Sequence, residues 1–341
     1  MKTPQAPISR RTAITYLLAA AASVILPRWP ISGSWAGKSP AQATEIQLRF
    51  DASRSILEAR SNFHAVYDSP HAREQFFLFL QHIFHLYPEQ QLHKLISDLT
   101  LSHATDREIY QALLANLGSI TPIFSALTYG LPALNKQKTE MAQETAELLG
   151  GTTRLHGYLE IGTPGRYIHG LTKVLSITGP VFVLNDMPQG YRPNDVAERG
   201  QLMRLGTYVP MGNYESFSHR LPKACVDLVT VFIGFHHAPP QARQDFLASI
   251  WHVLRPGGAL IVRDHDVNSL DMRTFVALAH DVFNAGTKIT WEDNAAQIRN
   301  FTSVDELSVA LATTGFTVSP YRRLQAHDPT RNTLMLFTKP T

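Results

Sequence analysis

An apolar segment that ends in an acid and runs directly into a glycine-rich turn constrains the fold of this chain most strongly. Residues 155–161 close on Glu160-Ile161, and the turn follows from Gly162 to Gly165. A helix is expected directly after the turn. This order puts a carboxylate and bare backbone N–H groups at the carboxyl end of a parallel strand, where open α/β sheets bind nucleotide-like ligands.

Strand and helix signals alternate from residue 154 onward, as is typical of a doubly wound fold. The run 226–233 is almost continuously apolar, which suits a buried parallel strand. We predict a mostly parallel, seven-stranded α/β sheet whose last two strands form an antiparallel hairpin at one edge. The expected strands are 155–161, 180–184, 206–210, 226–233, 259–262, 316–321 and 333–338.

Residues 46–150 carry few strand signals and are expected to be helical. Ser69-Pro70 is typical of an N-cap with proline at the first helical position. Thr105 and Glu108 have the spacing of a capping box, and Gly118 is expected to stop that helix. The other expected helices are 74–87, 89–99 and 136–149. Two interpretations remain for this aromatic-rich region: a lid that shapes a substrate pocket, or helices that pack on the sheet domain.

The first residues have the features of a secretory signal. Arg10-Arg11 precede a short alanine-rich apolar run, 16–26, which is shorter than the roughly 20 residues that span a bilayer. The paired arginines resemble a twin-arginine (Tat) signal, with Ala41-Gln42-Ala43 as a cleavage site. We therefore expect a signal or anchor at 1–43, a helical region at 44–151 and the sheet domain at 152–341. Periplasmic or other exported localisation follows; the alternative is a cytoplasmic or inner-membrane-anchored protein.

Composition excludes several classes of function. The net charge is only +3 over 341 residues, and no dense Lys/Arg stripe is present, so a nucleic-acid partner is not expected. The single cysteine, Cys225, excludes an intramolecular disulfide and cysteine-rich zinc sites. Apolar residues make up 44% of the chain and charged residues 17%, which is typical of a globular protein.

Five segments, taken in order, make residues 154–340 resemble the class I S-adenosylmethionine (SAM) dependent methyltransferases. The last of them is a Pro-Gly-Gly turn between a helix and an apolar strand, which serves folding rather than chemistry. The turn after the first strand departs from the family at Pro164, where many members carry a second glycine. The segments are 160–165, 185–186, 212–215, 227–237 and 253–262.

The resemblance implies SAM as the cofactor and a set of residues that contact it. Glu160 would help to fix the methionine end, directly or through water. The turn would let main chain approach the ligand, and the helix after it would offer N–H groups to the SAM carboxylate. The turn residues in this role are Gly162, Thr163 and Gly165.

Further cofactor contacts are implied after the second, third and fourth strands. Asp186 would accept hydrogen bonds from the ribose hydroxyls, with Asn185 as the neighbouring alternative. Asn213 would meet the adenine amino group and Tyr214 would pack on the ring, unless this segment is an ordinary turn. Phe235 would pack near the cofactor.

The candidate catalytic residues lie on the substrate side. His236 and His237 would orient substrate or accept a proton, and at least one of them is expected to be structural. Asp264 and His265 would form a general-base pair; the alternative is loop capping or an ion pair with Arg263. Metal binding is not expected, because adjacent histidines are assumed to point in different directions and no carboxylate has a convincing spacing as a partner ligand.

The leading hypothesis is therefore a SAM-dependent methyltransferase that acts on a small-molecule or lipid-like acceptor, with partners limited to that substrate, the Tat machinery and a membrane contact through the N-terminus. A non-catalytic scaffold that kept the fold is the first alternative, since export separates the protein from SAM. An NAD(P)-dependent oxidoreductase is the second; it would need glycines at the positions of Pro164 and Tyr167.

Overall fold

A computed structural model describes residues 61–122, 130–152 and 154–341. The predicted signal segment, 1–43, lies outside the described residues. Within those three ranges, no helix is both long and apolar enough to cross a membrane.

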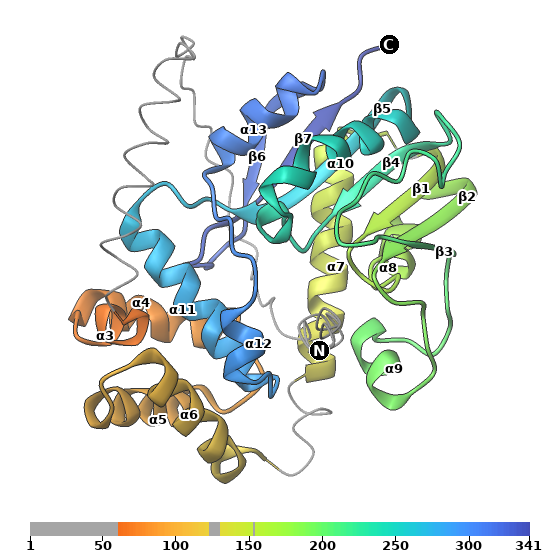
Figure 1. The fold of residues 1–341 in the computed structure, drawn as a ribbon. Helices are drawn as coiled ribbons and strands as arrows, with labels where there is room; N and C mark the ends of the chain where they lie inside the picture. The colour runs from red at the N-terminus through yellow and green to blue at the C-terminus, as the bar shows by residue number, and fades with distance from the viewer. Residues whose placement is uncertain (1–60, 123–129, 153) are drawn as a thin grey trace, which may run out of the picture.

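A seven-stranded sheet forms the centre of the molecule, in the order β3-β2-β1-β4-β5-β7-β6 (Figure 1). The first five strands pair in parallel, and β7 pairs antiparallel with both β5 and β6. The predicted fold class, including the antiparallel hairpin at the edge, is confirmed. The strands are β1 (Arg154–Ile161), β2 (Ser176–Asn185), β3 (Thr207–Pro210), β4 (Val226–Val231), β5 (Leu254–His265), β6 (Thr317–Leu324) and β7 (Asn332–Thr338).

The fifth strand is longer than its apolar run predicts. It pairs with β7 through Asp264 and His265, which lie opposite Thr333 and Asn332. These two polar residues therefore belong to the sheet itself rather than to a loop after it. Backbone pairing on β7 fixes where they lie, and this rigidity matters for the site described below.

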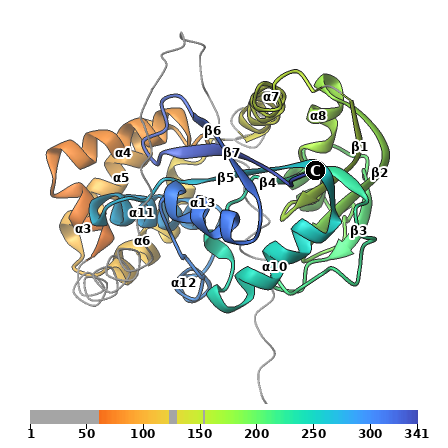
Figure 2. The same ribbon diagram turned by 90° about the horizontal axis from the view of Figure 1, so that it is seen from above.

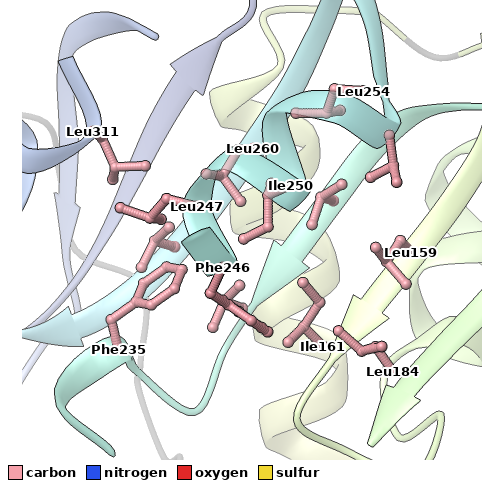
Figure 3. Close-up of a cluster of buried hydrophobic side chains, with 14 of the residues drawn as sticks. Leu159, Ile161, Leu184, Phe235, Phe246, Leu247, Ile250, Leu254, Leu260 and Leu311 are labelled. Carbon is pink, nitrogen blue, oxygen red and sulfur yellow. The ribbon is translucent and has the colours of Figure 1, made fainter. Parts of the chain in front are cut away.

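Helices cover both faces of the sheet, as a view from above shows (Figure 2). On one face, α7 (Leu131–Leu148) and α8 (Ile168–Val174) bury residues such as Met141 and Leu171. On the other, α10 (Pro240–Val253) and α13 (Val304–Thr313) pack Phe246, Ile250 and Leu311 against β1, β4 and β5 (Figure 3). The short helix α9 (Pro193–Arg199) follows β2 and precedes β3 in the chain.

The N-terminal helices share a separate core with one helix of the C-terminal half. Phe76, Ile96 and Leu113 are buried together with Leu278 and Val282. The helices are α3 (Asn62–Tyr67), α4 (Pro70–His82), α5 (Glu89–Ser102) and α6 (Asp106–Ile120), and they pack on α11 (Leu270–Gly286), next to α12 (Trp291–Ala295). By contrast α7, which sequence analysis grouped with them, packs on the sheet.

Local signals in the helical region are borne out at the N-termini and fail at two C-termini. The Ser69 cap and the Thr105–Glu108 capping box are both present. The helix through Gly118 continues to Ile120 rather than stopping. The helix expected at 74–87 ends at His82, because Tyr87 leaves it to donate a hydrogen bond to the Gly286 carbonyl at the end of α11, 2.7 Å away.

Candidate functional site

The turn after β1 has the backbone conformation that its glycines predict. Gly162 and Gly165 have φ of +84° and +78°, in the region that only glycine enters without strain. A Cβ at Gly162 would lie 2.4 Å from Cδ1 of Ile233, so this glycine also allows close packing inside the protein. Gln189, from the β2–β3 connection, donates to the Pro164 carbonyl at 3.0 Å and holds the turn from the other side.

Glu160 is buried beneath this turn, and its carboxylate is occupied by groups of the protein. It accepts hydrogen bonds from the Thr163 hydroxyl, from the Tyr167 N–H at 3.1 Å and from the Tyr158 hydroxyl at 3.2 Å. Burial raises the pKa of the Glu160 carboxyl, and the bonds from Thr163 and Tyr167 oppose that rise. Glu160 and Thr163 therefore fix the shape of the turn; contact with a methionine group stays a prediction.

Buried charges next to the turn were missed by sequence analysis. Arg166 is 1% exposed, donates to the Glu198 carbonyl at 2.9 Å and lies 3.8 Å from the Glu198 carboxylate. Burial raises the pKa of Glu198 to about 7. Lys138 donates to the Arg199 carbonyl at 3.3 Å, and burial lowers its pKa to about 8. The position of Arg166, one residue after Gly165, was the available signal.

Asp186 and Asn213 meet at the ends of β2 and β3. The Asn213 N–H donates to Oδ1 of Asp186 at 3.4 Å. Asn213 and Tyr214 both have positive φ, 58° and 63°, and two consecutive non-glycine residues in this region mark a strained turn. The two polar residues predicted to contact the nucleoside are therefore brought together at the carboxyl edge of the sheet.

Tyr214 and Phe235, predicted to pack near the cofactor, instead lie in the hydrophobic core. Each side chain is 1% exposed, and both rings contact Phe246 of α10, with centroids 5.1 and 6.2 Å apart. Figure 3 shows Phe235 beside Phe246 in this cluster. A cofactor role for either ring stays a prediction, and such a role would require the ring to be uncovered.

His236 and Asp264 form a buried pair between β4 and β5. His236 lies on the 3-10 turn η2 (Phe235–His237), and its Nδ1 is 2.6 Å from Oδ1 of Asp264. The same carboxylate accepts the backbone N–H groups of Phe235 at 2.7 Å and His265 at 2.8 Å. Although burial acts in the opposite direction, the His236 ring and these hydrogen bonds keep the pKa of Asp264 well below its ordinary value.

Asp264 thus pairs with His236 rather than with the side chain of His265, which was its predicted partner. The Nδ1 of His265 is directed to the Thr330 carbonyl, 2.9 Å away, and burial lowers the pKa of His265 to about 4. Of the two predicted alternatives, the structure has loop capping, because the Asp264 carboxylate accepts the N–H groups of Phe235 and His236. Arg263 donates to Gln325 at 2.7 Å instead. His265 is therefore a neutral ring at neutral pH.

A fourth histidine completes the cluster and was missed by sequence analysis. His280, on α11, lies with its ring centroid 5.0 Å from that of His236 and 5.7 Å from that of His237. Burial, followed by the neighbouring His236 and Arg299, lowers the pKa of His280 well below its ordinary value. The available signal was a row of polar residues within the apolar helix, His280, Asp281 and Asn284.

The expectation that His236 and His237 point apart is wrong. They lie on a 3-10 turn rather than on an extended strand, and their ring centroids are 4.2 Å apart. One ring nitrogen from each of His236, His237 and His280 can be chosen such that all three lie within 4.8 Å of one another. The expected divergence of these two side chains therefore no longer counts against a metal site.

Comparison with protein families gives one match, to the methyltransferase domain, over residues 197–262. The matched segment covers the third to fifth of the predicted motifs, including Asn213, His236 and the Pro-Gly-Gly turn. It does not include the glycine turn after β1 or Asp186. Comparison with curated proteins gives no match.

Comparison with solved structures gives matches to methyltransferases at low identity and low TM-score. A 1,6-didemethyltoxoflavin-N1-methyltransferase of Burkholderia thailandensis, bound to S-adenosylhomocysteine, is 16% identical, with a TM-score of 0.41, over 60% of this chain and 78% of that one. An O-methyltransferase family protein of the same organism is 13% identical, with a TM-score of 0.41, over 72% and 62%. The N-methyltransferase NodS of Bradyrhizobium japonicum is 14% identical, with a TM-score of 0.39, over 59% and 96%. Values this low do not transfer ligands or substrates to this chain.

Proposed function

We propose that this protein is a SAM-dependent methyltransferase that acts on a small-molecule acceptor. The observation that carries the proposal is the carboxyl edge of the sheet. There the glycine turn after β1 lies between Asp186, directly after β2, and the histidine-bearing turn after β4. The methyltransferase match over 197–262 supports the same activity from the sequence. The antiparallel β7 beside β5 distinguishes this sheet from the parallel 3-2-1-4-5-6 order of dinucleotide-binding folds.

Two features of the chain fit the cofactor. The turn at Gly162 and Gly165 brings main chain without side chains to the edge, and Asp186 offers a carboxylate to vicinal hydroxyls. In this proposal Glu160 and Thr163 act through the turn that they hold, and Asn213 orients Asp186 through its N–H. Sulfonium chemistry comes with the cofactor, so the chain contributes binding and orientation.

The acceptor is proposed to bind beyond the ends of β4 and β5. This side carries His236, His237, His265 and His280, together with Phe301, whose ring centroid is 5.1 Å from those of His236 and His280. Aromatic and imidazole faces of this kind suit a small, flat or apolar compound better than a highly charged one.

Calorimetric titration of SAM into the full chain tests the proposal. We expect micromolar binding, at least tenfold weaker in Asp186→Ala and unchanged in Asp245→Ala, which removes an exposed carboxylate on α10. NADH should not bind. A folded protein that binds no SAM would overturn the proposal.

A non-catalytic scaffold is the second candidate, and one observation favours it. Tyr214 and Phe235 are buried in the core, and the Glu160 carboxylate already accepts three hydrogen bonds from the protein. The two functions separate in the same titration followed by an assay: a scaffold binds no SAM, or binds it without methylating any member of an acceptor library supplied with methyl-labelled SAM.

A further inference from the structure

Three histidines from two distant parts of the chain converge beside the candidate acceptor side. His236 and His237 come from the turn after β4, and His280 comes from the middle of α11. One ring nitrogen of each can be chosen so that the three lie within 4.8 Å of one another. In residues 61–122, 130–152 and 154–341, this is the one group of three His, Cys, Asp or Glu side chains close enough to hold an ion.

The buried ring of His236 carries the decisive detail. Its Nδ1 faces Asp264, and an ionised carboxylate can only accept, so Nδ1 carries the hydrogen. With the hydrogen on Nδ1, Nε2 is the ring nitrogen that can offer a lone pair to a metal ion. That atom is buried and has no hydrogen-bond partner among the described residues, while the side chain is 5% exposed. A buried polar atom without a partner destabilises the fold, so a ligand bound at this point would remove that cost.

The hydrogen-bond acceptors near Nδ1 of His236 and His237 are of the kind that support metal-bound histidines. Metal ligands of this type commonly donate their second ring N–H to a carboxylate or a backbone carbonyl, which fixes the tautomer and the orientation. His236 has the Asp264 carboxylate at 2.6 Å, and Nδ1 of His237 lies 3.2 Å from the Ile298 carbonyl. Gly234 makes room for the first of these pairs, since a Cβ there would lie 2.5 Å from Nδ1 of His236.

We propose that His236, His237 and His280 form a binding site for a divalent transition-metal ion such as Zn²⁺. Imidazole nitrogens bind Zn²⁺ at about 2.0–2.1 Å, which puts them roughly 3.3 Å apart in a tetrahedral site. The chosen nitrogens lie within 4.8 Å of one another, so binding would require the rings to move closer together. Three protein ligands leave a fourth position for water or an oxygen or nitrogen atom of a substrate. The site is independent of the methyl donor and is tested without it.

The test is metal binding by the full chain after dialysis against a chelator. Zn²⁺ is titrated calorimetrically, the bound metal is counted by mass spectrometry, and Co²⁺ is added separately to read its visible absorption. We expect one ion per chain and an intense Co²⁺ spectrum typical of tetrahedral coordination. His280→Ala and His237→Ala should each weaken Zn²⁺ binding at least 100-fold. His71→Ala, which removes an exposed histidine of α4, should leave it unchanged.

Circular dichroism and urea unfolding of each variant distinguish loss of a ligand from loss of the fold. His280→Gln provides a second variant of similar size should the alanine variant unfold. Failure of the folded wild-type chain to bind Zn²⁺ or Co²⁺ would overturn the proposal, as would Zn²⁺ binding that persists in folded His280→Ala. Because SAM is absent, either result leaves the proposed methyltransferase activity to its own titration.

Discussion

Nδ1 of His236 lies 2.6 Å from Oδ1 of Asp264, and the two side chains are 5% and 8% exposed. The carboxylate also accepts the backbone N–H groups of Phe235, His236 and His265. One aspartate thus ties the turn after β4 to the end of β5. Its position in the sheet, opposite Thr333 of β7, is what makes the pairing rigid.

Asp264→Asn should therefore destabilise the protein strongly. An amide presents an NH₂ group where the carboxylate accepts several donors, so at least one buried N–H loses its partner. Leaving a buried donor without its acceptor costs about 1–3 kcal/mol, with the larger values where the acceptor was charged, and we expect a loss of unfolding free energy of about 3 kcal/mol. Urea unfolding at pH 7 measures it.

Asp245→Asn is the matched control for this measurement, because it makes the same chemical change at an exposed position on α10. It should shift the unfolding free energy by less than about 0.5 kcal/mol. Equal effects of the two substitutions would show that the Asp264 pair contributes nothing specific.

The glycine turn provides a prediction on cofactor binding. Gly162→Ala should weaken SAM binding at least tenfold and destabilise the fold by about 2 kcal/mol. The added Cβ combines a positive φ with a contact 2.4 Å from Ile233. Calorimetry with SAM and urea unfolding give the two numbers.

Gly151→Ala isolates the backbone contribution to that effect. Gly151 also has a positive φ, +92°, but a Cβ there meets nothing within 4 Å. We expect it to cost about 1 kcal/mol and to leave SAM binding unchanged. A Gly162→Ala protein that binds SAM as tightly as the Gly151→Ala protein contradicts the assignment of the turn to the cofactor.

The fold could be predicted from the sequence because its signals are local. Apolar runs and caps each act within a few residues, and they located the strands, though not all of their ends, and the starts of α4 and α6. The expected Pro-Gly-Gly turn is wrong, because these residues lie inside β5, which pairs with β4 from Leu254 onward. Contacts between distant segments were out of reach. Tyr87, beyond the end of its helix, donates to Gly286, and His280 of α11 meets His236 of the turn after β4, 44 positions earlier in the sequence.

The candidate site was predictable to the level of strand ends and no further. Asp186 and Asn213 do meet, because neighbouring parallel strands end at one edge. Which way a side chain points depends on tertiary packing, and this is why Tyr214 and Phe235 lie in the core and why His236 and His237 point together. For the same reason, Asp264 pairs with the side chain of His236 and not with that of the adjacent His265.

Export is a prediction that concerns Arg10 and Arg11. If these arginines form a Tat signal, replacing both with lysine should abolish export and leave uncleaved protein in the cytoplasm. Fractionation of the producing cells, followed by mass determination of the mature N-terminus, measures this. Unchanged export of the double variant contradicts the twin-arginine assignment.

Glu144 of α7 is expected to lower the unfolding free energy of the protein as pH rises. Burial raises its pKa to about 7, although Arg323 of β6 lies 3.6 Å away. The folded state therefore binds a proton between about pH 4.5 and 7, where the unfolded chain has released it. Since stability falls with rising pH wherever the folded state binds more protons, this group lowers the unfolding free energy as pH rises through that window.

Glu144→Gln should remove this loss and make the protein more stable than wild type at pH 7.5 by roughly 1–3 kcal/mol, with little difference at pH 4.5. Glu147→Gln is the matched control. Its carboxylate pairs with the same Arg323 at 2.7 Å but is 54% exposed, so its removal should change stability by less than about 1 kcal/mol at either pH. Urea unfolding at the two pH values measures all three proteins. A Glu144→Gln protein whose stability changes with pH as steeply as wild type would mean that Glu144 is ionised in the folded state throughout this range.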